Sequence, residues 1–283
     1  MAKTVSLVLG SGGARGMAHV GVIRWLDEHD YVIKSISGCS VGALIGGFYA
    51  AGKLDVYVDW LCELSAFDMV KLLDFKGSGG VVSGEILMEK FTELAGDHNI
   101  ENLPIKYTAV AADVTAEKEI WINQGSLVNA IRASVSLPMF FAPYHLNGRD
   151  LIDGGVLNPV PIAPTFQDKT DLTIAVNLGG SVNPIYNEVS EPENDSTSQK
   201  IVSYFKSIAA PDSFAQRTSM YQVADQSFDA MQGTIARMKL SAYPPDIEIE
   251  FARNLCGTLE FTRAEEMIEH GYNKCEEIIG SLK

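Results

Sequence analysis

The stretch Gly38-Cys39-Ser40-Val41-Gly42 decides how this chain is expected to fold. Residues 35–36 before it end a short buried strand, and residues 41–51 after it are small, apolar and free of proline, so the strand is predicted to turn sharply into a helix. The flanking glycines leave room where a Cβ would collide with strand or helix. Ser40 would then sit, strained, at the positive end of a helix, where an oxyanion is favoured. Such pentapeptides also occur in plain turns, so other parts of the chain have to support Ser40 as a nucleophile.

A glycine-rich loop near the start of the chain provides the first support. Residues 4–9 form a short β-branched and apolar run, and Gly10-Ser11-Gly12-Gly13-Ala14-Arg15-Gly16 follows it directly. Residues 17–29 then have the apolar spacing of a helix. A strand, a glycine loop and a helix in this order point several backbone N–H groups at one spot, which suits an anion.

Three kinds of anion site compete for this loop, besides an ordinary tight turn. A phosphate-binding P-loop requires a lysine followed by serine or threonine, and Arg15-Gly16-Met17 supplies neither. A dinucleotide fingerprint starting at Gly10 requires its third glycine at position 15, where Arg15 stands. An oxyanion hole requires only unhindered N–H groups, which Gly12 and Gly13 provide. Beside the Ser40 turn, an oxyanion hole is the favoured interpretation.

A third glycine-rich turn, Asp153-Gly154-Gly155, follows a strand predicted over residues 149–152. On its own, this tripeptide is typical of a plain turn. In this order, however, the three motifs resemble the patatin-like phospholipase family, which has a glycine-rich oxyanion loop with a basic residue, then G-x-S-x-G, then D-G-A or D-G-G. Residues 131–138 and 261–272 also resemble the family's segment before the aspartate and the closing helix of its compact bacterial members.

The resemblance spans nearly the whole chain and implies a lipid acyl hydrolase with a serine–aspartate dyad. It implies Ser40 as nucleophile, Asp153 as base, and backbone N–H groups of Gly12 and Gly13 as the oxyanion hole. It needs no metal and no cofactor. The supporting motif positions are Gly10, Arg15, Gly16, Gly38, Gly42, Gly154 and Gly155, with Arg15 expected to anchor the loop. The sequence departs from the family at Ser11, where many members have glycine, and at Cys39, where threonine is frequent; neither change removes a group that the mechanism requires.

The residues themselves leave the identity of the base to be weighed. A Ser-His-Asp enzyme needs an imidazole, and none of the histidines has the expected place in the order of motifs, although His145 stays open because it lies near Asp153 in the sequence. His19 is expected to be a packed or capping side chain. With a dyad, partial burial is expected to raise the pKa of Asp153 toward the working range. Cys39 is a rival nucleophile that we expect to point back into the fold.

Composition agrees with one globular enzyme domain over residues 1–283, because 46% of the side chains are hydrophobic and 20% are charged. With 36 acidic and 22 basic side chains, the formal net charge is −14, which argues against nucleic acid and against electrostatic docking on anionic lipid. Transient contact with a membrane surface would therefore use apolar side chains. Scattered cysteines and the absence of a visible targeting segment or apolar span predict no metal site, no disulfides and a cytoplasmic location. The oligomeric state stays open.

Alternating patterns along the chain predict an α/β fold with three layers, in which helices cover both faces of a mostly parallel central sheet. Binding sites in such sheets lie at the carboxyl ends of the strands. Strands are expected at residues 105–112, 119–122, 172–178 and 247–251, the last one at an edge or half exposed, and helices at residues 126–135, 216–240 and 264–278.

Several segments, and the function itself, have more than one interpretation. Residues 187–199 are acidic and polar and are predicted to form a mobile loop. Residues 66–83 fit either a glycine-hinged flap over an acyl-chain site or a core helix with a loop. The methionines of residues 216–240 fit an acyl groove or, preferably, ordinary core packing. Acyl transfer to an acceptor other than water, a catalytically weak regulatory protein on the same fold, and a dinucleotide-binding oxidoreductase stand beside lipid hydrolysis as alternatives.

Overall fold

The computed structural model describes residues 2–64, 82–188, 214–258 and 260–282, together with Asp68 and Leu72. Its strands are β1 (Lys3–Leu9), β2 (Tyr31–Cys39), β3 (Lys106–Asp113), β4 (Lys118–Ile122), β5 (Tyr144–Leu146), β6 (Arg149–Asp153), β7 (Leu172–Gly180) and β8 (Ile247–Ala252). Its α-helices are α1 (Ala18–Glu28), α2 (Val41–Ala50), α3 (Leu54–Glu63), α5 (Glu85–Ala95), α6 (Leu127–Ser134), α7 (Pro184–Glu188), α9 (Phe214–Ala242) and α10 (Ala264–Ile279).

The strands form one sheet in the order β5-β6-β3-β2-β1-β7-β8, and β4 also pairs with β3. Strands β3, β2, β1, β7 and β8 run parallel to one another, whereas β4 and β6 run antiparallel to β3. Strand β8 lies at one end of the sheet, and its residues alternate between more and less buried positions, as expected for an edge strand.

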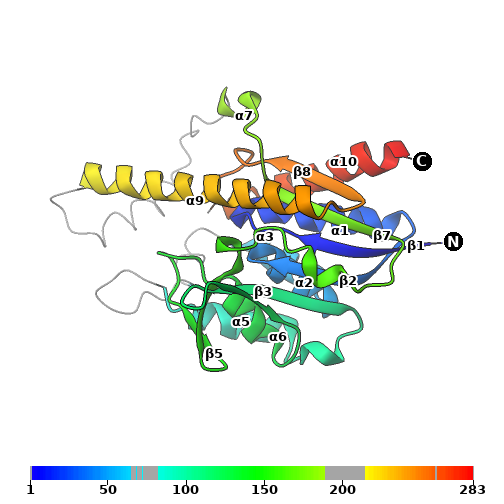
Figure 1. The fold of residues 1–283 in the computed structure, drawn as a ribbon, viewed down its shortest axis with the longest axis horizontal. Coiled ribbons are helices and arrows are strands. Elements are labelled where there is room, and N and C mark those ends of the chain that lie inside the picture. The colour runs from blue at the N-terminus through cyan, green and yellow to red at the C-terminus, as the bar shows by residue number, and fades with distance from the viewer. Residues whose placement is uncertain are drawn as a thin grey trace.

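Alternation along the strands sends side chains into two cores. In β1, Leu7 and Leu9 belong to the larger core, to which α1, α2 and α10 contribute, whereas Val8 belongs to a smaller core with Ala236 and Leu240 of α9. Figure 1 shows α9 lying along the sheet, with its N-terminal part extending past the strands. Helices therefore cover both faces, and the predicted three-layer α/β fold with a mostly parallel sheet is confirmed.

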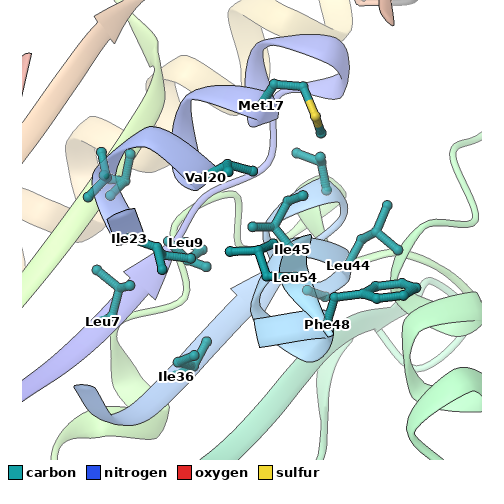
Figure 2. Packing of buried hydrophobic residues seen from close by; sticks show 14 of the residues in the cluster. Leu7, Leu9, Met17, Val20, Ile23, Ile36, Leu44, Ile45, Phe48 and Leu54 are labelled. Atoms are coloured by element: carbon teal, nitrogen blue, oxygen red, sulfur yellow. The ribbon is translucent and has the colours of Figure 1, made fainter. Parts of the chain in front are cut away.

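The larger core fixes the strand-to-helix units that carry the conspicuous glycine motifs. Ile23 of α1 lies near Leu9 of β1, and Ile45 and Phe48 of α2 lie beside them (Figure 2). All four side chains are fully buried. Burying each such side chain contributes about 1.5–3 kcal/mol, so the glycine loop and the Ser40 turn are attached to well-packed elements.

The expected helix at residues 216–240 is present as α9. The prediction that its methionines pack in the core is wrong for two of them. Met231 and Met238 are 57% and 69% exposed, because the face of α9 that meets the sheet carries Gly233, Ala236 and Leu240 instead. A spacing of apolar residues indicates a helix without telling which face is covered.

Two other expectations fall largely outside the described residues. Of the predicted flap at residues 66–83, the structure describes Asp68, Leu72, Val82 and Ser83; of the predicted loop at residues 187–199, it describes two residues, which end α7. The assignment of residues 1–283 to a single domain stays a prediction. None of the helices in the described ranges combines the length and apolar character that crossing a membrane requires.

Candidate active site

The turn between β2 and α2 holds Ser40 in a strained backbone conformation, with φ 55° and ψ −126°. Such conformations cost about 1–3 kcal/mol and persist where surrounding contacts enforce them. Here the Ser40 N–H donates to Ser134 Oγ at 2.9 Å, and the Ser134 hydroxyl donates to the Val110 carbonyl at 2.7 Å. The last residue of α6 thus ties the turn to β3.

Close backbone packing explains the glycines around Ser40. A Cβ on Gly38 would lie 2.4 Å from the Gly42 carbonyl oxygen, and a Cβ on Gly42 would lie 2.1 Å from that of Leu9. Both distances are far below a normal contact, so a side chain at either position would push α2 off the sheet. The glycines therefore stand where the Ser40 turn leaves no space.

Asp153 reaches the Ser40 turn because β6 takes the place that β2 leaves beside β3. Strand β2 pairs with β3 as far as Cys39 opposite Val110, and β4 lies on the other side of β3. Strand β6 runs antiparallel to β3 and ends with Asp153 opposite Ala111, one residue further along β3. The carboxylate is thereby placed next to the end of β2, at the carboxyl edge of the parallel strands.

The carboxyl group of Asp153 is almost completely buried. Its Oδ1 accepts a hydrogen bond from the Gly155 N–H at 2.7 Å and faces the Cys39 thiol at 3.8 Å. Burial raises the pKa of Asp153 to about 6, and interactions with the Ser40 hydroxyl, the Gly155 amide and the Cys39 thiol partly oppose that rise.

The Ser40 hydroxyl lies near the Asp153 carboxyl group, and both residues line the same space. Within the described residues, Oδ2 is buried without a hydrogen bond of standard geometry, although the Ser40 hydroxyl is close enough to lower the pKa of the carboxyl group. Hydrogen bonds between catalytic groups are often long before substrate binds. The carboxyl group can therefore accept the Ser40 proton once a hydrogen bond between the two side chains has formed.

The glycine loop presents two backbone donors beside Ser40. The Gly10 and Ser11 amides donate to the Val176 and Pro159 carbonyls, at 3.0 and 2.8 Å, and the Ala14 amide donates to the Thr258 carbonyl at 2.9 Å. Between them, the Gly12 and Gly13 amides donate to no acceptor among the described residues.

Glycine is required at position 13, because its φ is +57° and a Cβ there would lie 2.3 Å from the Thr258 carbonyl oxygen.

Arg15 anchors this loop through its guanidinium group. Its guanidinium is buried and donates from Nε to the Gly12 carbonyl at 3.0 Å and from Nη2 to Asp229 Oδ1 at 3.2 Å, while Nη1 donates to the Arg253 carbonyl. These contacts agree with the expected anchoring role of Arg15.

The alternative side chains are poorly placed for catalysis. His19 is fully buried, its Nε2 lies 2.8 Å from the Gly10 carbonyl oxygen, and burial lowers its pKa to about 4, so the ring is neutral and supports the loop. His145 is 69% exposed at its side chain, pairs with Asp150 at 2.9 Å, and does not line the space around Ser40. Burial, followed by the nearby Asp153, raises the pKa of Cys39 well above its usual value, so its thiol stays protonated.

Two hollows meet at Ser40. A small polar space, here called the crevice, holds about 40 Å³ and is lined by Ser11, Gly12, Gly13, Arg15, Ser40, Leu137, Asp153, Phe228, Asp229, Gln232 and Thr258. A larger space, here called the apolar cavity, holds about 160 Å³ and is lined mainly by aliphatic and aromatic side chains, among them Leu44, Tyr57, Trp60, Phe91, Val135 and Phe141. Gly13 and Ser40 line both spaces.

The structure thus brings together Ser40, Asp153, Gly12 and Gly13, which lie far apart in the sequence. Sequence reasoning missed Ser134 as a partner of the Ser40 amide, although it lies in the segment 131–138 that resembles a family motif. It also missed Asp229 and Gln232, which reach the crevice from α9. No local sequence signal distinguishes them from other polar helix residues.

Comparisons with known proteins bear on this geometry. The family model described as patatin-like phospholipase matches residues 7–166, a range that contains Ser40, Asp153 and the glycine loop. An uncharacterized NTE family protein of Mycobacterium tuberculosis is 36% identical, over 94% of this chain and 89% of its own length. The lysophospholipase nte1 of Neurospora crassa is 27% identical over 99% of this chain, which corresponds to 18% of that much longer protein.

Among solved structures, VipD from Legionella pneumophila is similar in fold, with a TM-score of 0.53 and 17% sequence identity. The match covers 99% of this chain and 67% of the VipD chain. At this identity the likeness concerns the fold alone.

Proposed function

Because this chain belongs to the patatin-like phospholipase family, a family of lipid hydrolases, we propose that it cleaves carboxylic ester bonds of lipids through a Ser40–Asp153 dyad and an acyl-enzyme. The observation that carries the proposal is the position of Ser40 at the junction of the crevice and the apolar cavity. One hollow suits a reacting ester carbonyl, and the other suits the hydrocarbon chain attached to it.

In the first step, the Ser40 hydroxyl attacks the ester carbonyl carbon while its proton passes to Asp153. An aspartate of ordinary pKa is a weak base, but a pKa of about 6 keeps Asp153 ionised at neutral pH and makes it a better proton acceptor. The proton then moves from Asp153 to the leaving alkoxide, which departs as an alcohol. The fatty acyl group stays bound to Ser40 as an ester.

The negative oxygen that forms on the carbonyl is stabilised by the N–H groups of Gly12 and Gly13. Both amides lie in the crevice and make no hydrogen bond to a described residue, so they are available to an oxyanion. Removing one such donor typically costs about 2.7–4 kcal/mol of transition-state stabilisation. The N-terminus of α2, next to Ser40, adds the favourable end of a helix dipole.

The apolar cavity supports a lipid acyl group as the substrate. Its walls include the edge-to-face pair Tyr57–Phe91, and the lining is almost free of polar groups. An acyl chain that leaves water for this space gains about 0.8 kcal/mol for each buried CH₂. In the second step, water activated by Asp153 attacks the acyl-enzyme and releases the fatty acid.

The test is hydrolysis of a p-nitrophenyl ester of a short-chain fatty acid by two variants and two matched controls. Ser40→Ala and Asp153→Asn should each fold like the wild type and lose kcat by about 10³-fold or more. The controls Ser227→Ala and Asp150→Asn change the same residue types at exposed positions and should keep full activity. Wild-type kcat in Ser40→Ala or in Asp153→Asn would refute the dyad, and loss of activity in Asp150→Asn would redirect attention to the His145–Asp150 pair.

A further inference from the structure

Helix α9 contributes one wall of the crevice, although it begins more than fifty residues after the last predicted site motif. Phe228, Asp229 and Gln232 line the crevice together with Ser40 and Asp153. One and two helical turns further along, Ala236 and Leu240 enter the smaller core, so the same face of α9 is fixed to the sheet. Asp229 and Gln232 are therefore held at the crevice by the packing of their own helix.

Asp229 acts on the glycine loop through Arg15. The guanidinium of Arg15 is buried, with its side chain 4% exposed, and Asp229 Oδ1 accepts from Nη2 at 3.2 Å. Within the part of the chain that the structure describes, the other hydrogen-bond partners of this guanidinium are two backbone carbonyls, those of Gly12 and Arg253. Among the described residues, Asp229 is thus the partner that supplies a negative charge and fixes the direction of the Arg15 fork.

The hydrogen bond from Arg15 to the Gly12 carbonyl determines where the Gly13 N–H points. The Gly12 carbonyl and the Gly13 amide belong to one planar trans peptide, in which C=O and N–H point in opposite directions. Because Arg15 Nε holds the carbonyl oxygen at 3.0 Å, the N–H is directed to the side away from the guanidinium. Gly13 borders both the crevice and the apolar cavity at Ser40, so this is the side on which an ester carbonyl would lie.

Gln232 makes a second connection between α9 and both sides of the crevice. Its Oε1 accepts a hydrogen bond from Ser11 Oγ at 3.2 Å, within the glycine loop. Its Nε2 lies against the turn after Asp153, where a Cβ on Gly155 would be only 2.3 Å away. Two neighbouring polar residues of one helix face therefore contact the parts of the chain that carry the oxyanion donors and the base.

From these contacts we propose that Asp229 is a positioning residue for the oxyanion hole, acting through Arg15 on the Gly12–Gly13 peptide. The proposal rests on the proposed function, because an oxyanion forms only if Ser40 attacks a carbonyl group. Loss of the Asp229 charge should leave the substrate-binding cavity intact and misdirect one donor. The effect should therefore appear in kcat and leave KM nearly unchanged.

The experiment measures kcat and KM per active site, with the active sites counted by complete titration with a fluorophosphonate. Asp229→Asn should lower kcat by about tenfold or more with KM changed less than about twofold. Asp229→Glu, which keeps the charge, should recover most of the loss. Asp113→Asn is the control, because it breaks another aspartate–arginine pair, Asp113–Arg149 at 2.8 Å, that borders neither hollow, and it should leave kcat unchanged.

A double-mutant cycle shows whether Asp229 acts through Arg15. Arg15→Met should lower kcat at least as much as Asp229→Asn, and adding Asp229→Asn to Arg15→Met should cause little further loss. Removing both partners also avoids leaving a buried charge unpaired, so the double variant stays informative if Asp229→Asn alone unfolds. Independent, multiplicative losses in the two variants would overturn the proposal, as would wild-type kcat per titrated site in Asp229→Asn.

Ser40→Ala in the same assay distinguishes failure of the proposed function from failure of the proposal for Asp229. An active Ser40→Ala variant would refute the proposed function itself. An inactive Ser40→Ala variant together with an unaffected Asp229→Asn variant would refute only the role of Asp229.

Discussion

At the residue scale, the proposed chemistry depends on a carboxyl group that the fold keeps away from water. Asp153 is buried at the end of β6, where burial raises its pKa to about 6 and the Gly155 amide, with the Ser40 and Cys39 side chains, limits the rise. This environment makes Asp153 a stronger base than an exposed aspartate without making it neutral at physiological pH. Its neighbour Cys39, which was expected from the sequence to point back into the fold, is a buried, protonated thiol that faces Asp153 Oδ1 at 3.8 Å.

The pKa of Asp153 predicts how activity depends on pH. In the proposed mechanism the ionised carboxylate is the base, so lowering the pH through about 6 protonates Asp153 and removes it from the reaction. We expect kcat/KM for a short-chain aryl ester to be constant at neutral pH, to reach half of this value near pH 6, and to fall about tenfold for each further pH unit.

The pH profile is measured with a neutral substrate, and circular dichroism at each pH serves as the control for folding. A profile that stays flat well below pH 6 in the folded protein would contradict the role of Asp153. A midpoint near 6 that persists in Asp153→Asn would assign the titration to another group.

At the scale of elements, the site is formed where two strands share one position beside β3. Strand β2 leaves the sheet at Cys39, and β6 enters with Asp153 from the opposite direction. The helix that follows Ser40 must lie very close to β1, because Gly42 touches the backbone of Leu9. This close approach places the N-terminus of α2 next to the glycine loop.

The packing of α2 on β1 gives a prediction about stability. In Gly42→Ala, the new Cβ would meet the Leu9 carbonyl oxygen at 2.1 Å, so α2 has to move. We expect a loss of about 1–3 kcal/mol in the free energy of unfolding and a large loss of activity, since Ser40 moves with the helix.

Gly179→Ala is the matched control for Gly42→Ala. A Cβ on Gly179 would find its nearest atom at 3.5 Å, an ordinary contact, and should leave stability nearly unchanged. Urea unfolding of both variants decides the question. Equal stability of Gly42→Ala and the wild type would contradict the close packing of α2 on β1 at Gly42.

The elements were largely predictable because their signals are local. The apolar run before the glycine loop indicated β1, and the helix expected at residues 126–135 is present as α6, where the Ser126 hydroxyl accepts from the Asn129 amide at 3.3 Å. The order of the three motifs also suggested that Ser40, Asp153 and the glycine loop would meet.

Residues that act across long sequence distances were not predictable. Asp229 and Gln232 approach the glycine loop only because α9 packs across the sheet, and nothing in their own segment indicates that contact. The exposed side chains of Met231 and Met238 show the same limit, because helical spacing does not reveal which face the rest of the chain covers.

At the scale of the whole molecule, charge should govern how the protein meets a lipid surface. The formal net charge of −14 repels anionic headgroups, and ions screen such repulsion over a Debye length of about 8 Å at 0.15 M salt. Lipid contact would then depend on apolar side chains rather than on a basic patch.

We therefore expect hydrolysis of a lipid ester in phosphatidylcholine vesicles to slow when phosphatidylserine is added at low ionic strength, and to recover as salt is raised. A soluble aryl ester assayed under the same conditions is the control and should be insensitive to both changes. Faster hydrolysis on the anionic vesicles at low salt would contradict this account of the surface and would indicate a local basic docking site.

The most direct measurement of the central claim is a crystal structure of the protein after reaction with a long-chain alkyl phosphonate ester. We expect phosphorus bound to Ser40 Oγ, the phosphonyl oxygen within about 3 Å of the Gly12 and Gly13 amide nitrogens, and the alkyl chain in the apolar cavity. An adduct on Cys39, or one on Ser40 whose oxygen points away from the glycine loop and from Asp153, would contradict the assignment of these residues.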